Sequence, residues 1–350
     1  MNSDKTSIGH DELGRFIHDL LVKHGASDRD AAVVANGLVW ANLRGSDGHG
    51  VSRLPRYLNL LARGEIDPKA QPRIVHDRAA TFIIDAGHGF GPVAVMNAAA
   101  HALERARRTG ICLALIRHTT HTGAIGRYAQ WIAERGCAAV LMGAGPALMA
   151  YYGARVASMA TSPIAIAVPS GKGPIVLDMA TSTISNGKIL QARSTGTALP
   201  EGAVLNTAGQ ATTDAKEAEI LLPLGGPKGS GLALMFEMLA SVLAGAPIQA
   251  RALGPEKRTR HTGNTAMFVI DIETLRPLGE FENDADALAA IVRALPRQAG
   301  FDEILLPGER GKRTEAASRR SGIPIPKKLW EELGAIAKSH GVTPLQAASR

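Results

Sequence analysis

The chain has 350 residues, of which 45% are apolar and 20% are charged, and no stretch is strongly biased in composition. These values fit a folded protein with a substantial core and exclude a disordered chain. The net charge of +7 favours anionic ligands, but the basic residues are scattered and aromatic residues make up only 4%, so we expect no nucleic-acid partner.

The cysteines and the apolar segments indicate the cellular compartment of the protein. Cys112 and Cys137 lie in apolar runs without CxxC spacing, so we interpret them as small buried hydrophobes in a reducing environment. The N-terminus is polar, and the most apolar helix candidate, residues 231–246, is shorter than the ~20 residues that span a bilayer. We interpret that helix as buried and expect a cytoplasmic protein without a membrane partner.

The first seventy residues are helical in pattern. Apolar residues recur every three or four positions until Gly25, and Ser27 is the predicted N-cap of a second helix that runs to Gly45. A third, short helix is predicted over residues 54–61. Helices return near the C-terminus, so we expect both ends of the chain to form a helical frame.

Between the two ends the periodicity changes. Residues 73–86 predict a β-hairpin, and strands then alternate with helices, which favours an α/β core with buried strands. Residues 196–223 are polar and predict loops. The predicted strands are 111–117, 137–143, 164–168, 175–178 and 266–272, and the predicted helices are 93–108, 124–134, 285–295 and 326–340.

Residues 45–57, GSDGHGVSRLPRY, form the first stretch whose side chains could bind a ligand or take part in a reaction. They place His49 between two glycines and follow it with Arg53, Arg56 and Tyr57. An arginine offers a planar fork to an anion, and a histidine can exchange protons near neutral pH. The stretch therefore predicts an anion site with a proton-transfer group beside it.

A second histidine lies in residues 117–128, RHTTHTGAIGRY, where a predicted strand passes into a helix. Such a turn exposes backbone N–H groups that bind anions, and His121 lies beside them. The alternative interpretation is that His121 caps the turn or packs at the surface.

Two further stretches combine polar residues with an apolar element. In residues 176–188, Asp178 ends a strand beside hydroxyl residues and either orients a polar ligand group or caps the next helix. In residues 222–239, glycines flank Lys228 directly before the apolar helix, where a lysine and open amides suit a phosphate. That second pattern is equally typical of a tight turn.

Several common sites are not supported. The turns GHGFGP and GAGPAL lack the third glycine of the Rossmann fingerprint. Asp47, His49, His121 and Asp178 are possible metal ligands, but no HExxH or paired-cysteine spacing is present, so we expect no metal. A serine hydrolase would need GxSxG, which is also absent.

Four stretches, taken in order, resemble the malate/L-lactate dehydrogenase family of NAD(P)-dependent oxidoreductases. They are GSDGHGVSRLPRY, THTGAIGRY, TSPIAIAVPS with DMATSTISNGK, and LPLGGPKGSGLALMFEML. The resemblance extends from the first helix to residues 305–310. The family also includes sulfolactate and ureidoglycolate dehydrogenases and reductases of piperideine- and pyrroline-carboxylate.

The resemblance implies a non-Rossmann α/β fold that binds NAD or NADP, in agreement with the missing glycine. It also implies a homodimer. In this interpretation residues 73–299 form the cofactor-binding region, and residues 1–72 with 300–350 form the helical frame and the substrate and dimer region. The implied substrate contacts are Arg53, Tyr57 and Thr161, and the implied cofactor contacts are His121, Thr122, Gly123, Ala124, Ile125, Asp178, Met179, Ala180, Lys228, Gly229, Leu306, Pro307, Gly308, Glu309 and Arg310.

The implied reaction interconverts a small 2-hydroxy acid and its 2-oxo acid. Arg53 would bind the substrate carboxylate, and a histidine would protonate the developing alkoxide. We favour His121 as this acid, with His49 in the same pocket.

Three positions depart from the family pattern: Gly48 replaces a serine, Ser162 an asparagine, and Lys188 the acid of the imine-reducing members. These departures favour hydroxy-acid oxidation, with reduction of a cyclic imine carboxylate as the alternative.

Overall fold

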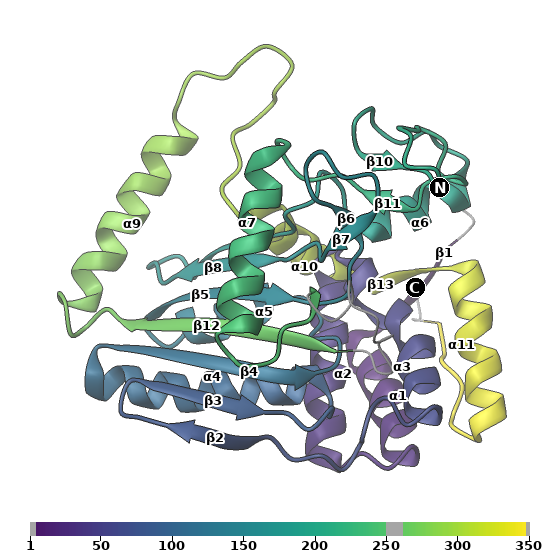
Figure 1. Ribbon diagram of the computed structural model, residues 1–350, viewed down its shortest axis with the longest axis horizontal. Coiled ribbons are helices and arrows are strands. Elements are labelled where there is room, and N and C mark those ends of the chain that lie inside the picture. The colour runs from purple at the N-terminus through teal and green to yellow at the C-terminus, as the bar shows by residue number, and fades with distance from the viewer. Residues whose placement is uncertain (1–4, 250–261, 348–350) are drawn as a thin grey trace.

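The computed structural model describes residues 5–249 and 262–347 of the chain. Its centre is a seven-stranded sheet in the order β2-β3-β4-β12-β5-β8-β9 (Figure 1). Strands β3 and β4 are parallel, and every other neighbouring pair in this sheet is antiparallel. The strands are β2 (Arg73–Asp77), β3 (Thr81–Asp85), β4 (Ile111–Thr119), β5 (Cys137–Ala144), β8 (Ile164–Val168), β9 (Ile175–Met179) and β12 (Gly263–Asp271).

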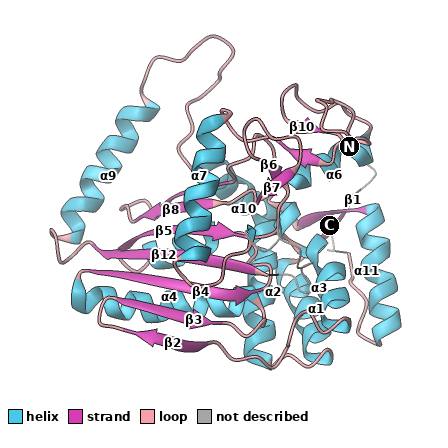
Figure 2. Ribbon diagram, in the orientation of Figure 1, coloured by secondary structure: helices cyan, strands magenta, loops and turns pink. Residues whose placement is uncertain are grey.

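Helices cover both faces of this sheet. Helices α4 (Gly91–Thr109) and α5 (Gly126–Ala133) pack on one face, where alanines supply much of the core and allow close approach. Helix α7 (Pro227–Glu237) and the π-helical turn η3 (Met238–Val242) pack on the other (Figure 2). Strands covered on both faces explain the apolar runs in the sequence. The α/β prediction is confirmed, and both cysteines are free and buried.

A second core joins the two ends of the chain. It lies among α1 (His10–Lys23), α2 (Asp28–Leu43), α3 (Leu54–Ala62) and α11 (Lys327–His340). Ser27 caps α2 as predicted, because its side chain accepts a hydrogen bond from the Asp30 amide. An unpredicted two-stranded sheet, β1 (Lys5–Ile8) with β13 (Ile323–Pro326), completes this layer. The division into residues 1–72 with 300–350 and residues 73–299 stays a prediction.

A smaller sheet corrects the interpretation of residues 196–223 as loops. Its order is β10-β11-β6-β7, and two of its strands, β10 (Val204–Leu205) and β11 (Ile220–Leu221), lie in that region. Two-residue strands are too short to show a periodicity, which explains why the sequence did not reveal them. The remaining elements are β6 (Met149–Ala150), β7 (Ala157–Met159), α6 (Asn186–Thr195) and α10 (Glu309–Ser321).

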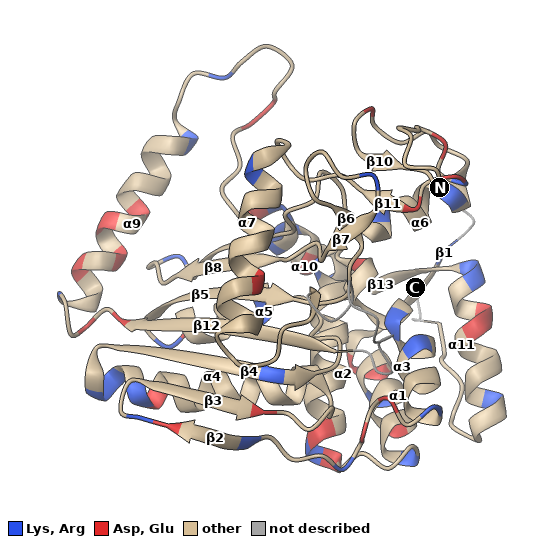
Figure 3. Ribbon diagram, viewed as in Figure 1, with Lys and Arg blue, Asp and Glu red and all other residues tan. Residues whose placement is uncertain are grey.

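Two helix predictions need correction. Helix α9 covers Leu278–Arg293, so it starts seven residues before the predicted position 285, and it projects from the body of the molecule (Figure 1). The apolar helix predicted as buried is buried on one side only, since Leu232, Met235 and Val242 are exposed. No helix among the described residues is long and apolar enough to cross a membrane. Figure 3 shows basic residues spread among acidic ones over the described elements.

Candidate active site

Two single-turn 3-10 helices, η1 (Asp47–His49) and η2 (Val51–Arg53), carry the first histidine and the arginine. The buried side chain of Asn42 holds them in place: its Oδ1 accepts the Val51 amide at 2.7 Å, and its Nδ2 donates to Asp47 at 2.9 Å. A Cβ atom at Gly50 would lie 2.2 Å from the Asn42 Oδ1. The glycine at position 50 is therefore required for this loop to close on Asn42.

Arg53 is partly exposed and has unused donors. Its Nε donates to the carbonyl of Gly48, and among the described residues no protein acceptor takes its two Nη groups. Burial lowers the pKa of the Arg53 guanidinium, although an arginine stays charged at neutral pH. A substrate carboxylate can therefore pair with the two free Nη groups.

The two predicted histidines lie together. The rings of His49 and His121 stack with their centroids 5.7 Å apart and an interplanar angle of 13°. Burial, followed by the nearby Arg53 charge, lowers the pKa of His49 to about 4. His49 is therefore uncharged at neutral pH. Two histidines 72 positions apart in the sequence thus lie side by side, and that they share a substrate pocket stays a prediction.

Hydrogen bonds fix the tautomer of His121. Its Nδ1 accepts from the Gly123 amide at 3.3 Å and lies 2.7 Å from the Tyr57 hydroxyl. Because an acceptor nitrogen carries no proton, the Tyr57 hydroxyl donates to it, and the ring proton of neutral His121 is on Nε2. The pKa of the fully buried Tyr57 is raised by burial, which keeps this donor protonated. Contact of Tyr57 with substrate stays a prediction.

The turn after His121 meets strand β9. The Asp178 carboxylate accepts the Gly126 amide at 2.9 Å, so it caps the start of α5. The actual N-cap of α6 is Ser185, whose side chain accepts the Lys188 amide. A Cβ at Gly126 would lie 2.7 Å from the Asp178 Oδ2, so this close approach requires glycine. Burial raises the pKa of the Asp178 carboxyl.

The amides beside this contact are available to a ligand. In the described part of the chain, the N–H groups of Thr122, Ala124 and Ile125 donate to no protein acceptor. Unsatisfied amides next to a helix N-terminus form an anion-binding surface. This observation fits the anion-binding turn predicted beside His121, and contact of residues 121–125 with a cofactor stays a prediction.

The Lys228 loop differs from the prediction. The amides of Lys228, Gly229 and Ser230 donate to loop carbonyls of residues 225, 224 and 226, so these amides are not open to a ligand. The exposed Lys228 ammonium is the group that remains for an anion. Gly229 is tightly packed, since a Cβ there would lie 2.6 Å from the Thr181 carbonyl.

Thr181 also connects to the predicted substrate contact at Thr161. The Thr161 carbonyl accepts the Thr181 amide at 2.9 Å and the Thr181 hydroxyl at 2.8 Å. These bonds place Thr161 next to the predicted contacts Met179, the last residue of β9, and Ala180, which follows it. Whether the Thr161 side chain reaches the substrate stays a prediction.

Residues 306–310 approach the same strand from the start of α10. Gly308 is left-handed, with φ of 78°, and a Cβ there would lie 2.6 Å from the Val176 carbonyl. Glu309 holds the turn by accepting the Leu306 amide at 2.9 Å. That bond, ahead of nearby arginines, lowers the pKa of Glu309, so its carboxylate has a structural role. Pro307 and Arg310 are exposed.

Sequence reasoning missed Arg44, which ties this turn to the segment just before the loop that carries His49 and Arg53. The Arg44 Nη2 donates to the Gly308 carbonyl at 3.0 Å, and Nη1 pairs with Glu315 at 3.2 Å. Its partners lie more than 260 residues away in the sequence, so no local pattern could reveal them. Among the described residues no group of three or more His, Cys, Asp or Glu is arranged to hold a metal ion.

Comparison with known proteins gives one consistent family. The sequence profile described as malate/L-lactate dehydrogenase matches residues 8–334. Malate dehydrogenase of Pyrococcus abyssi is 34% identical over 349 residues, which cover 97% of this chain and 96% of the relative. L-sulfolactate dehydrogenase of Methanocaldococcus jannaschii is 35% identical and covers 94% of this chain and 95% of its own length.

A reductase and a solved structure are also similar. The Δ1-pyrroline-2-carboxylate/Δ1-piperideine-2-carboxylate reductase of Pseudomonas syringae pv. tomato is 33% identical, covering 95% of this chain and 96% of the relative. The structure of malate dehydrogenase from Pyrococcus horikoshii OT3 superposes with a TM-score of 0.90 at 32% identity, covering 99% of this chain and 98% of the other. The resemblance and the fold that it implied are thereby confirmed.

Proposed function

Because the chain belongs to the malate/L-lactate dehydrogenase family, we propose that it is an NAD(P)-dependent oxidoreductase that interconverts a small 2-hydroxy acid and its 2-oxo acid. Malate and sulfolactate, the substrates in the names of two relatives, are the first candidates. Both are dianions, which suits a basic protein whose site contains an arginine with free donors.

Each of the site residues has a different role in the proposed reaction. The two free Nη groups of Arg53 bind the carboxylate next to the reacting carbon and fix its orientation. During reduction His121 acts in its protonated imidazolium form: Nε2 donates a proton to the carbonyl oxygen and the ring is left neutral, and during oxidation the neutral ring takes the hydroxyl proton back. His49, uncharged at neutral pH, supplies a hydrogen-bonding group beside it.

The bound nicotinamide supplies or accepts the hydride at the substrate carbon. The residues present fit such a cofactor: unsatisfied amides of residues 122, 124 and 125 suit its phosphates. The glycines at 126, 229 and 308 mark places where segments pack too closely for a Cβ. Asp178, Lys228 and Arg310 supply polar side chains around this surface.

The single observation that carries this proposal is the juxtaposition of Arg53, His49 and His121 in a chain of this family. The test mixes the protein with NADH or NADPH and a panel of 2-oxo acids and follows the absorbance of the reduced nicotinamide. Turnover of oxaloacetate or sulfopyruvate is expected. No turnover of any 2-oxo acid with either cofactor would contradict the proposal, and the ratio of the two cofactors decides between NAD and NADP.

Reduction of a cyclic imine carboxylate is the second candidate, and the reductase relative favours it. The same Arg53 would bind the carboxylate, and His121 would protonate the ring nitrogen. Adding pyrroline-2-carboxylate to the same assay separates the candidates. We expect kcat/KM for the best 2-oxo acid to exceed that for the imine at least tenfold.

We further propose a cytoplasmic homodimer. Its support is the apolar surface of α7 and η3, where Leu232, Met235, Met238 and Val242 are exposed at three- and four-residue spacing. Helix α9 adds Leu288 and Ile291, which are 63% and 62% exposed. Exposed apolar side chains that recur along one side of a helix, as on α7 and η3, are typical of protein interfaces.

A further inference from the structure

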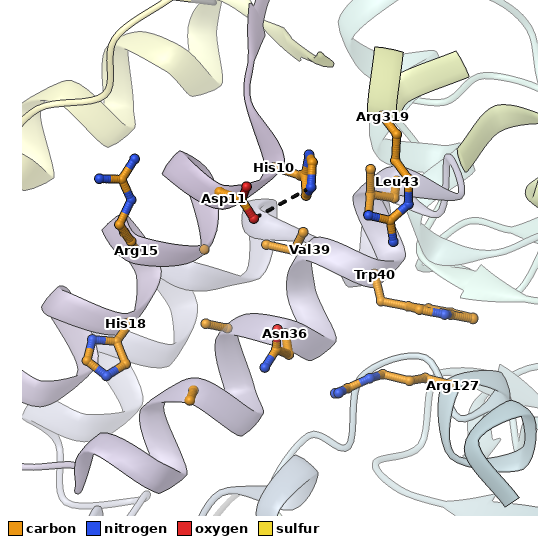
Figure 4. A pocket seen from close by; sticks show the side chains of 13 residues that line it. His10, Asp11, Arg15, His18, Asn36, Val39, Trp40, Leu43, Arg127 and Arg319 are labelled. Carbon is orange, nitrogen blue, oxygen red and sulfur yellow. Dashed lines mark ion pairs between the residues drawn. The ribbon is translucent and has the colours of Figure 1, made fainter. Parts of the chain in front are cut away.

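A solvent-open cavity lies outside the proposed active site. It has a volume of about 640 Å³ and is lined by residues of α1, α2, α5 and α10 (Figure 4). Val39, Trp40 and Leu43 of α2 form an apolar wall. Small-molecule sites are typically clefts of ~300–1,000 Å³ with apolar walls and a few convergent polar groups.

The convergent polar groups are cations. Arg127 of α5 and Arg319 of α10 enter from opposite sides of Trp40 in Figure 4, and Arg15 also lines the cavity. The one carboxylate in the lining is Asp11, which is highly exposed and pairs with His10 at 3.5 Å. Because Arg319 already pairs with Glu315 at 2.7 Å, the lining cations that form no ion pair among the described residues are Arg127 and Arg15.

Arg127 has no charge partner of its own. Its Nη1 donates to the Val33 carbonyl at 3.3 Å, and among residues 5–249 and 262–347 it forms no ion pair with a carboxylate. Burial lowers the pKa of this guanidinium. A partly buried, unpaired cation costs stability. The fold nevertheless makes room for it, since a Cβ at Gly37 would lie 3.3 Å from the Arg127 Nη1.

We propose that this cavity binds an amphipathic anion, a carboxylate or phosphate carried on an apolar or aromatic body. The Arg127 guanidinium takes the anionic group, with Arg15 raising the local potential. The body of the ligand packs on Trp40, Val39 and Leu43. This ligand site is distinct from the substrate site at Arg53.

The cavity wall continues into both proposed cofactor segments. Arg127 follows Gly126, whose amide donates to Asp178. The Trp40 ring lies 4.9 Å from the Arg44 guanidinium, which in turn donates to the Gly308 carbonyl. A ligand that shifts Arg127 or Trp40 should therefore change the affinity for the nicotinamide cofactor, a consequence that rests on the proposed function.

The test uses the full-length protein and three probes: 3-phenylpropionate, the neutral 3-phenylpropan-1-ol and inorganic phosphate. Titration calorimetry and tryptophan fluorescence should show saturable binding of 3-phenylpropionate, at least tenfold weaker binding of phosphate, and none of the alcohol. Arg127→Met should weaken the 3-phenylpropionate affinity at least tenfold. Arg320→Met is the matched control, because Arg320 is next to Arg319 but does not line the cavity.

Thermal unfolding without probe separates a ligand role from a structural one. Arg127→Met should leave the melting temperature unchanged or raise it, since an unpaired cation is removed. Three results would overturn the proposal: no saturable binding of 3-phenylpropionate at millimolar concentration, equal affinity in Arg127→Met, or phosphate binding as tightly as 3-phenylpropionate. These binding measurements need no nicotinamide, so they test the proposed ligand site even if the dehydrogenase proposal fails.

Discussion

At the scale of single residues, Arg53 and His121 have separable roles. In the proposed mechanism the free Nη groups of Arg53 would bind substrate in the ground state and the transition state alike, so Arg53→Ala should mainly raise KM for the acid. His121→Ala removes a proton donor that acts only in the transition state and should mainly lower kcat, by about 10²- to 10⁴-fold. Steady-state kinetics on both variants measure this. The reverse pattern would mean that the two roles are exchanged.

Tyr57 should act through His121. Removing its hydroxyl in Tyr57→Phe deletes the 2.7 Å bond to Nδ1, which is worth about 1 kcal/mol. We expect kcat to fall about fivefold with KM nearly unchanged. Nitrogen NMR of the ring should show part of His121 in the Nδ1-protonated tautomer. An unchanged tautomer together with unchanged kcat would contradict the positioning role.

His49 should make stability depend on pH. Its pKa is lowered from 6.5 to about 4 by burial, so between these values the unfolded chain binds a proton that the folded chain does not. The free energy of unfolding must therefore fall as pH decreases through this window, by at most about 1.4 kcal/mol per pH unit. Denaturant unfolding of wild type and His49→Gln should show a smaller loss in the variant. Parallel curves would refute the assignment.

At the scale of elements, the turn before α10 depends on Gly308. Gly308→Ala must adopt φ of 78° and place a Cβ 2.6 Å from the Val176 carbonyl, which costs at least ~1–2 kcal/mol. The turn should shift, and the KM for the cofactor should rise about tenfold. Gly279→Ala in α9 is the control, because no atom lies within 4 Å of the added Cβ. Equal effects of the two substitutions would show that crowding at Gly308 is unimportant.

The elements also show what the sequence could and could not predict. The hairpin β2–β3 and helix α2 follow from local patterns, since β-branched residues and the Ser27 cap act over a few positions. The pairing of β1 with β13 depends on a partner more than 300 residues away, and no local signal specifies it. The candidate site shows the same difference between local and distant signals. The motifs predicted that His49 and His121 belong to one pocket. The contacts of Asn42, Arg44 and Arg127 follow no sequence pattern or join distant residues, so they were not predicted.

At the scale of the whole molecule, the described residues leave one side of α7 and η3 exposed and apolar. Met235 is 54% exposed and lies between Leu232 and Met238, which are also exposed. Burying such side chains against a second copy would contribute about 1.5–3 kcal/mol each. A charge at the centre of that surface should therefore oppose association.

We expect Met235→Glu to raise the dimer dissociation constant at least tenfold, equivalent to about 1.4 kcal/mol, with sedimentation velocity as the measurement. Val75→Glu on β2 is the matched control, because Val75 is 51% exposed and β2 lies at the opposite edge of the molecule from α9 (Figure 1). Because both side chains are exposed in the single chain, neither substitution should impair folding. The two variants should differ in sedimentation only if an interface covers α7. Equal sedimentation of the two variants would therefore place the dimer contact elsewhere or exclude a dimer.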